Sequence, residues 1–402
     1  MTSGLLETDY ALRVSELLVW AMVALAAVGI GFITRDWRIA QQLPNLPEQP
    51  APVADRVVVI IPARNEEANI ARCLEGVLCQ THDNYEVIVV DDQSTDATPR
   101  VVRAYQLRHI DRLRLVPGRP LSAGWVGKCN ACWHGAAQTD GREDWLLFLD
   151  ADTAPQPDLI RGMVALARAR SLDVLSVMPL NLLPTWPERL ILPVFYQFAL
   201  TAFPLQLMLS EASPPRSVLA NGQCLLIRRE AYWAIGGHEA VKDKVLEDIE
   251  LAQALRRAGF RVGIALGFSH IRVRMYRSMA EIAQGLGKHA VAGRKASGPR
   301  AFWAVARLSL TLLVPMLLVL ASVALNAADP SPAKGVAGLA ALAVLGAQWA
   351  FWAQRYRTWY GLPRRIAPLA PIGWLLYLWI VVRSTAEVWM RRGVRWKERV
   401  YG

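Results

Sequence analysis

Four long uncharged stretches on either side of the central region constrain the fold of this chain more than any other feature. They cover residues 17–33, 308–328, 335–354 and 366–382. Each has a length near the roughly 20 residues that an α-helix needs to cross the apolar core of a bilayer. They also account for the hydrophobic share of 53%, which is high for a wholly soluble protein. The sequence therefore predicts a membrane protein whose apolar segments flank a long central region.

The first stretch is typical of a membrane anchor and not of a cleaved signal peptide. Only Arg13 supplies a basic residue before it, and no small-residue cleavage site follows Ile33. Four prolines then fall between residues 39 and 56, which suits a linker. We expect the following segments: an N-terminal transmembrane anchor over 1–38, a proline-rich linker over 39–56, a catalytic domain over 57–293, and a C-terminal membrane region with a basic tail over 294–402.

The basic residues beside these stretches predict an orientation. Arg35 and Arg38 follow the first stretch, whereas only Arg13 precedes it. Because Lys and Arg favour the cytoplasmic side of a membrane, we expect a multi-pass protein of the cell (inner) membrane with a cytoplasmic central region. The net charge of +11 lies largely outside that region, in segments such as the tail from Arg383 onward. Such residues indicate contact with a membrane surface, so no nucleic-acid partner is expected.

Two apolar segments are poor candidates for a full crossing. Residues 190–210 are uncharged, but prolines interrupt them, and a crossing there would separate two acidic clusters of the central region. We expect a helix lying along the membrane interface at this point. A crossing by residues 366–382 would carry the basic tail away from the cytoplasm, and Pro368 and Pro371 fall inside that segment. We therefore expect two to three C-terminal transmembrane or interfacial helices, with 366–382 re-entrant or interfacial.

The central region alternates buried strands with helical stretches. Runs of β-branched and aliphatic residues at 57–61, 86–90 and 145–149 are typical of strands buried on both faces. Helical segments follow the first two runs, at 69–78 and 97–107. This alternation predicts an α/β domain with right-handed βαβ units and a doubly wound, Rossmann-like sheet. Ligands bind such sheets beyond the carboxyl ends of the strands.

Acidic residues cluster where ligands would bind. Asp150 and Asp152 follow the strand at 145–149, and two carboxylates at this spacing can approach one hard divalent cation. Asp91 and Asp92 end the strand at 86–90, where they could cap the next helix or accept hydrogen bonds from a base or ribose. The pattern at 246–252 is helical, so its acidic pair could catalyse or simply occupy the first turn of a helix. The five cysteines include one CxxC pair, Cys129 and Cys132, which indicates small helix residues more than a metal site because no second pair exists.

These segments together resemble a known family. The ordered motifs are PARNE (62–66), VVDDQSTD (89–96), FLDAD (148–152), GQCLLIRREAYWAIGGH (222–238) and LEDIELA (246–252). As a set they resemble family 2 glycosyltransferases of the GT-A fold over residues 57–293. The segments GWVGK (124–128) and RWKERVY (395–401) are similar to those of a membrane-bound branch that includes carotenoid glucosyltransferases of the chlorobactene type and hopene-associated glycosyltransferases. Two departures stand out. Glu398 replaces a glycine that is usual in the tail motif, and residues 284–288 stand roughly where cellulose and chitin synthases have a QxxRW motif. The absence of that motif argues against a processive polymer synthase.

The resemblance implies roles for particular residues. The nucleotide-sugar site would contain Pro62, Arg64, Glu66, Asp91, Asp92, Lys128 and Asp150. A Mg²⁺ or Mn²⁺ cofactor would bind Asp152, supported by Asp150. The catalytic residues would be Glu247 and Asp248, with Asp248 the general base that activates an acceptor hydroxyl for an inverting displacement.

The resemblance also implies partners. They are a nucleotide-sugar donor such as a UDP-hexose, a lipid or isoprenoid acceptor, and the membrane. Two other functions remain open at this point. One is a transferase that loads a polyprenyl phosphate, whose ionised acceptor needs no base, and the other is a non-catalytic membrane scaffold that has kept the fold.

Overall fold

A computed structural model describes residues 41–203, 214–328 and 330–390 throughout, most of residues 17–39, and the segments 394–396 and 399–401. The chain packs into two compact units. The helical unit consists of Met1–Gln42, Arg189–Ala202 and Pro299–Trp379. The sheet unit consists of Leu43–Glu188, Phe203–Gly298 and Ile380–Gly402. The boundaries expected from the sequence remain predictions.

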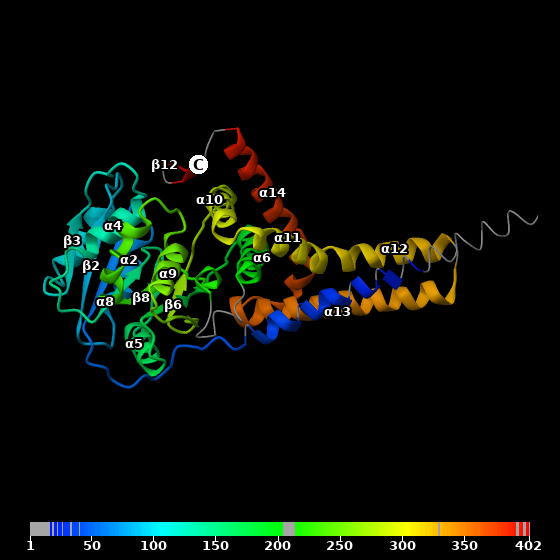
Figure 1. Ribbon diagram of the computed structural model, residues 1–402, viewed down its shortest axis with the longest axis horizontal. Helices are drawn as coiled ribbons and strands as arrows, with labels where there is room; N and C mark the ends of the chain where they lie inside the picture. Colours follow the sequence, from blue (N-terminus) through cyan, green and yellow to red (C-terminus); the bar gives the residue numbers. More distant parts are fainter. Residues whose placement is uncertain are drawn as a thin grey trace, which may run out of the picture. The chain divides into compact units, whose positions relative to one another are not determined.

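A seven-stranded mixed sheet forms the centre of the sheet unit (Figure 1). Its strands are β1 (Val57–Ala63), β2 (Tyr85–Asp91), β3 (Leu113–Pro117), β4 (Trp145–Leu149), β6 (Val174–Met178), β8 (Cys224–Arg228) and β9 (Val262–Leu266), in the order β3-β2-β1-β4-β8-β6-β9. Strand β8 runs antiparallel to β4 and β6, and the other neighbouring pairs are parallel. The predicted α/β class is confirmed. The reversed direction of β8 was not predicted, because an apolar strand buried on both faces has the same pattern in either direction.

Helices cover both faces of this sheet. They are α2 (Ile70–Leu78), α3 (Thr98–Gln106), α4 (Gly127–Ala136), α5 (Leu159–Ala169), α8 (Arg229–Ala234) and α9 (Glu247–Arg257). The sheet unit also contains α10 (Met279–Ser297) and the short 3₁₀ turns η1 (Pro215–Ser217) and η2 (Gly237–Val241). A small second sheet joins β5 (Thr153–Pro155), β10 (Ile271–Val273) and β7 (Leu180–Asn181). The hairpin β11 (Val394–Trp396) and β12 (Arg399–Tyr401) follows α14 near the C-terminus.

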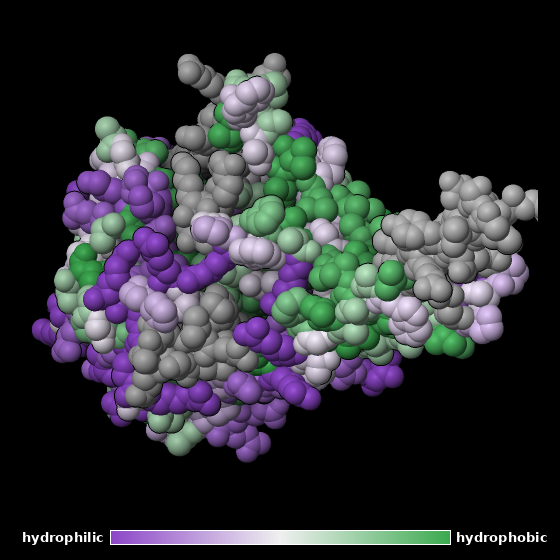
Figure 2. Space-filling model, turned by 45° about the vertical axis from the view of Figure 1, so that its right-hand side comes forward, coloured by the Kyte–Doolittle hydropathy of each residue, from purple (hydrophilic) through white to green (hydrophobic). Residues whose placement is uncertain are grey.

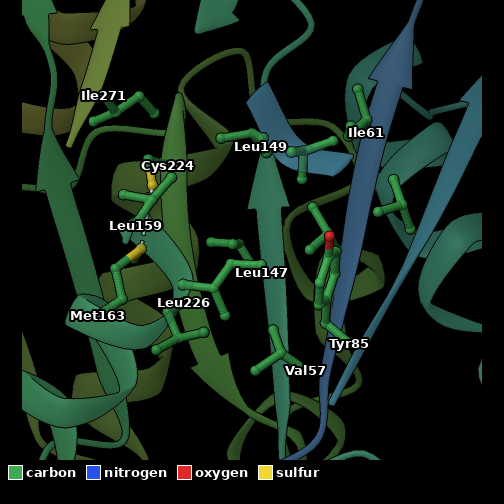
Figure 3. Close-up of a cluster of buried hydrophobic side chains, with 14 of the residues drawn as sticks. Val57, Ile61, Tyr85, Leu147, Leu149, Leu159, Met163, Cys224, Leu226 and Ile271 are labelled. Carbon is green, nitrogen blue, oxygen red and sulfur yellow. Dashed lines mark hydrogen bonds between the residues drawn. The ribbon is translucent and has the colours of Figure 1, made fainter. Parts of the chain in front are cut away.

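Alternate residues of each strand pack on opposite faces of the sheet. Val57, Val59 and Ile61 of β1 join the core on the side of α2 and α5, whereas Val58 and Ile60 join the core on the side of α4 and α9. Figure 3 shows the first of these cores, in which the thiol of Cys224 donates a hydrogen bond to the Met163 sulfur at 3.4 Å. Successive side chains of a strand point to opposite faces of the sheet, and helices cover both faces. The strands are therefore apolar on both faces.

The predicted linker packs against the sheet unit. Leu43 and Leu46 are buried, and the Leu46 N–H donates to the Leu266 oxygen at 3.0 Å. In return, the Leu266 N–H donates to the Pro44 oxygen at 2.8 Å. The proline-rich segment is therefore hydrogen-bonded to the end of β9 and is not a flexible linker.

The helical unit consists mainly of apolar helices. It contains α11 (Pro299–Leu312), α12 (Val314–Ala328), α13 (Pro332–Tyr360), the short 3₁₀ helix η3 (Arg364–Leu369), most of α6 (Trp186–Ala202) and the first half of α14 (Ala370–Trp389). In the described part of the chain, three segments are long and apolar enough to cross a membrane: Pro299–Ala328, Lys334–Tyr360 and Arg364–Trp389. Exposed apolar side chains such as Trp303, Leu320 and Leu339 line these helices, and hydrophobic surface gathers over them in Figure 2.

Two of the predicted membrane segments need comment. The described residues between 17 and 39 are helical, but the predicted anchor at 17–33 lies partly outside the described residues, as do positions 204–210 of the predicted interfacial helix. Pro368 and Pro371 do not interrupt the last apolar segment, because they lie in η3 and at the start of α14. The whole segment Arg364–Trp389 is long enough to cross a membrane, and the re-entrant or interfacial position of 366–382 remains a prediction.

Candidate active site

The carboxyl ends of three parallel strands bring the predicted polar residues to one edge of the sheet. Strand β1 pairs in parallel with β2 and with β4, and Ala63 at the end of β1 is in register with Asp91 at the end of β2. Asp150 directly follows the last residue of β4. The loops after these strands therefore meet where ligands bind in open α/β sheets.

Hydrogen bonds join the loop after β1 to the loop after β2. The Asn65 N–H donates to Ser94 Oγ at 3.0 Å, and the Thr95 N–H donates to Asn65 Oδ1 at 2.8 Å. Arg64 Nη1 donates to the backbone oxygen of Asp92 at 2.8 Å. Asn65 has a φ of 52°, a left-handed conformation that asparagine tolerates better than most residues. The two loops thus form one rigid rim.

The remaining residues of the predicted nucleoside pocket lie on the same rim. Pro62 is in β1, Glu66 Oε2 accepts a hydrogen bond from Asn69 Nδ2 at 2.8 Å, and Asp91 Oδ1 accepts one from the Ser94 N–H at 3.2 Å. The structure thus gathers Pro62, Arg64, Glu66, Asp91 and Asp92. Their contact with a nucleoside stays a prediction.

Lys128 links the acidic pair after β4 to the acidic pair of α9. Its Nζ lies 2.8 Å from Asp150 Oδ1 and 2.9 Å from Glu247 Oε1. Lys128 is the second residue of α4, and Glu247 is the first residue of α9. Two helix N-termini and one strand end therefore meet at a single ammonium group, which was predicted only as a diphosphate contact.

The pKa values of this cluster follow from burial and from the ion pairs. Burial lowers the pKa of Lys128, but the charges of Asp150 and Glu247 outweigh it and hold that pKa well above its ordinary value. Burial raises the pKa of Glu247, but the Lys128 charge outweighs it and leaves that pKa below its ordinary value. Burial raises the pKa of Asp150, although Lys128 opposes this rise. Lys128 and Glu247 are therefore both charged at neutral pH.

Asp248 has the environment that a general base requires. Its Oδ2 accepts a hydrogen bond from the Gly222 N–H at 2.7 Å, and its Oδ1 accepts one from the Ile249 N–H at 2.9 Å. Burial, and then repulsion by the charged Glu247, raise the pKa of Asp248 to about 6. A carboxylate with this pKa is ionised at pH 7 and still basic enough to accept a proton. Asp248 is also a first-turn residue of α9, as the structural interpretation predicted, and its catalytic role stays a prediction.

The predicted metal ligands fit a cation that is shared with a diphosphate. Asp152 lies between β4 and β5, and Arg72 Nη2 donates to its backbone oxygen at 3.1 Å. Carboxylate oxygens are suitable ligands for Mg²⁺ and Mn²⁺. Among the described residues, no group of three or more His, Cys, Asp or Glu side chains is arranged to hold a metal ion. Asp150 and Asp152 would thus supply part of a coordination shell that phosphate oxygens and water complete.

Neighbouring His and Cys side chains have structural roles. The Tyr232 hydroxyl and His238 Nδ1 lie 2.9 Å apart, and burial lowers the pKa of His238 to about 3, so it stays neutral. Cys129 and Cys132 are buried on α4 as free thiols, and burial raises the pKa of both. The expectation that the CxxC pair fills helix space agrees with this burial.

Three residues near the cluster had no predicted role. A methyl group built on Gly222 would lie 2.9 Å from Asp248 Cβ, so only glycine leaves room for that carboxylate. Lys288 and His289 lie on α10, where burial lowers the pKa of both, that of His289 to about 3, while the Glu247 charge opposes the shift. Lys288 stands roughly where a QxxRW motif would fall, and this position in the sequence could have marked it as a candidate site residue.

Comparisons with known proteins agree with this architecture. Residues 58–236 match the family described as Glycosyl transferase family 2. The 4,4'-diaponeurosporenoate glycosyltransferase of Staphylococcus aureus is 27% identical over 252 residues, which cover 62% of this chain and 64% of that relative, slightly less than two thirds of its length. The solved mannosyltransferase of Pyrobaculum calidifontis, in complex with GDP-Man and Mn²⁺, is similar at a TM-score of 0.52 and 22% identity, over 91% of this chain and 98% of that one. The fold of the sheet unit is therefore the GT-A fold, and the match over residues 58–236 agrees with the family that the ordered motifs predicted.

Proposed function

We propose that this protein transfers a sugar from a nucleotide-sugar donor, a UDP-hexose, to a hydroxyl group of a membrane lipid or isoprenoid, with inversion at the anomeric carbon. The observation that carries the proposal is the junction at Lys128. Lys128 pairs there with Asp150 at the end of β4 and with Glu247, the neighbour of Asp248, whose pKa is raised to about 6. This arrangement supports a diphosphate beside Asp150 and a general base at Asp248.

Each part of the site has a task in this proposal. The rim formed by Arg64 and Asp91 binds the nucleoside, and the Lys128 ammonium keeps Asp150 and Glu247 in place beside the diphosphate. A divalent cation held by Asp152 and Asp150 would neutralise the charge that builds on the leaving diphosphate. Asp248 removes the proton of the acceptor hydroxyl, a task typically worth ~10²–10⁴ in rate. Gly222 keeps the Asp248 carboxylate oriented through its N–H.

A lipid acceptor is supported by two independent observations. Three segments of the described chain are long and apolar enough to cross a membrane. The relative from Staphylococcus aureus is named for diaponeurosporenoate, a carotenoid carboxylate, which supports an isoprenoid acceptor and is silent on a hydroxyl group. A membrane enzyme would meet such an acceptor in the bilayer, and the use of a sugar nucleotide places the sheet unit in the cytoplasm in this proposal.

The test is a direct search for the product. Purified full-length protein is incubated with total membrane lipid, MnCl₂ and a panel of radiolabelled UDP- and GDP-sugars, and label is measured in the organic phase. The proposal predicts one preferred donor and a product whose label survives mild acid, as a glycoside of a hydroxyl group does. An acid-labile sugar phosphate would instead identify a polyprenyl-phosphate transferase. Absence of both labelled product and UDP binding would indicate a scaffold.

A further inference from the structure

A buried arginine in the helical unit has no role in the proposed reaction. Arg355, near the C-terminal end of α13, is 3% exposed, and its buried Nη1 has no hydrogen-bond partner among the described residues. Its guanidinium carbon lies 3.4 Å from the centroid of the Trp359 ring, one turn along the same helix. The structure packs this basic side chain inside the helices.

The charges around Arg355 do not balance in the described part of the chain. The carboxylate whose charge acts on Arg355 is that of Asp36. Asp36 Oδ2 is already paired with Arg307 Nη2 and also accepts a hydrogen bond from Gln197 Nε2 at 3.4 Å. The charge of Arg35 acts on Asp36 as well, so three guanidinium groups surround this one carboxylate and positive charge is in excess.

A bound anion would neutralise this excess of positive charge. Burying a charge without a counter-charge strongly destabilises a fold. A guanidinium can donate two parallel hydrogen bonds to phosphate oxygens, and stacking on an aromatic ring leaves its edge available for them. Arg355 lies five residues before the end of the candidate span Lys334–Tyr360, which also ends in aromatic residues typical of the headgroup level. Phosphate groups are the anions concentrated at that level.

We propose that Arg355 is the anchoring residue of a phosphate-binding site within the helical unit, formed with Arg307 and Trp359. The site takes either the phosphodiester of an anionic phospholipid or free phosphate. It is separate from the nucleotide-sugar site and does not depend on the proposed reaction.

The test compares two arginines of the same helix. Full-length protein is placed in nanodiscs of phosphatidylcholine, of phosphatidylcholine with phosphatidylglycerol, or of phosphatidylcholine with added inorganic phosphate. Melting temperature and lipid retention by native mass spectrometry are measured for wild type, Arg355→Gln and Arg357→Gln, because Arg357 is exposed. We expect phosphatidylglycerol to raise the melting temperature of wild type and of Arg357→Gln. We expect Arg355→Gln to bind phosphatidylglycerol about tenfold more weakly than wild type, which is the scale of lost charge-assisted hydrogen bonds.

The three nanodisc conditions distinguish a lipid phosphate from free inorganic phosphate. Stabilisation by phosphatidylglycerol alone supports a lipid phosphate, and equal stabilisation by inorganic phosphate supports a soluble one. If Arg355→Gln does not fold, Arg355→Lys replaces it, because lysine keeps the charge but cannot form the bidentate hydrogen bonds of arginine. The lipid retention of Arg355→Lys is then compared with that of wild type. Wild type that gains nothing from either anion, or retention that is the same in all variants, overturns the proposal.

Discussion

Asp248 accepts two hydrogen bonds and has a raised pKa, which should make the rate of the reaction depend on pH. The N–H groups of Gly222 and Ile249 favour its charged form, while burial and the Glu247 charge favour its protonated form more strongly. Because its pKa is raised to about 6, a growing fraction of Asp248 is protonated, and inactive as a base, as the pH falls through that value.

The expected pH profile follows directly. Initial rates with a hydroxyl acceptor should be level above pH 7 and fall about tenfold per pH unit below about pH 6, because one proton is bound. UDP affinity, measured over the same range, serves as the control. A rate that stays level down to pH 5 would exclude Asp248 as the base.

Gly222 tests the positioning of that base. Gly222→Ala would place a methyl group 2.9 Å from Asp248 Cβ and 3.1 Å from its Oδ2, so the carboxylate must move. We expect turnover to fall about 10²-fold, the scale of a misplaced catalytic group, with UDP affinity retained. Gly346→Ala is the matched control, because nothing lies within 4 Å of the added methyl group. Equal turnover in the two variants would show that Asp248 does not need this close approach.

The elements α4 and α9 depend on each other through Lys128. An acidic residue at the first turn of α9 is favoured by the helix dipole, whereas a basic residue at the first turn of α4 is not. Asp150 and Glu247 therefore stabilise Lys128 where its own helix does not. The junction is an interaction among elements, and no single segment of the sequence contains it.

Removal of the Lys128 ammonium should destabilise the sheet unit. Lys128→Met leaves two carboxylates without their counter-charge, and we expect a loss of about 1–3 kcal/mol, discounted for partial exposure of the lysine. The control is Lys244→Met, because Lys244 pairs with Asp243 at 2.9 Å on an exposed surface and should cost less than about 0.5 kcal/mol. Thermal unfolding in detergent compares the two. A Lys128→Met melting temperature equal to that of the control would contradict this role.

The elements of the sheet unit were largely predictable, and their junctions were not. Apolar runs marked β1, β2 and β4 within two residues, because strands buried on both faces leave a continuous pattern. The acids at their ends could be placed at one edge because parallel strands end together. The approach of Gly222 to Asp248 and the position of α10 could not be predicted, since they depend on packing between distant segments.

At the scale of the whole molecule, the orientation of the C-terminal end is the open question. Helix α14 belongs to a segment long enough to cross, Arg364–Trp389, whereas a crossing would place the basic tail outside the cytoplasm. The cost of exporting several basic residues leads us to predict a cytoplasmic tail, with 366–382 re-entrant or interfacial.

A single cysteine decides this orientation. Gly402→Cys is made in a Cys79→Ser background, because the other four cysteines are buried. A membrane-impermeant maleimide should label the new thiol only after cells are permeabilised. Labelling in intact cells would show that the tail has been exported.

The account as a whole depends on Asp248 acting on the acceptor and not on the donor. The most direct measurement is therefore turnover and UDP affinity of Asp248→Asn, side by side with wild type, using the acceptor and donor found in the labelling experiment. The account predicts that turnover falls by ~10²–10⁴ while the dissociation constant for UDP in the presence of Mn²⁺ stays within about threefold. Undiminished turnover, or a loss of UDP binding as large as the loss of turnover, would contradict it.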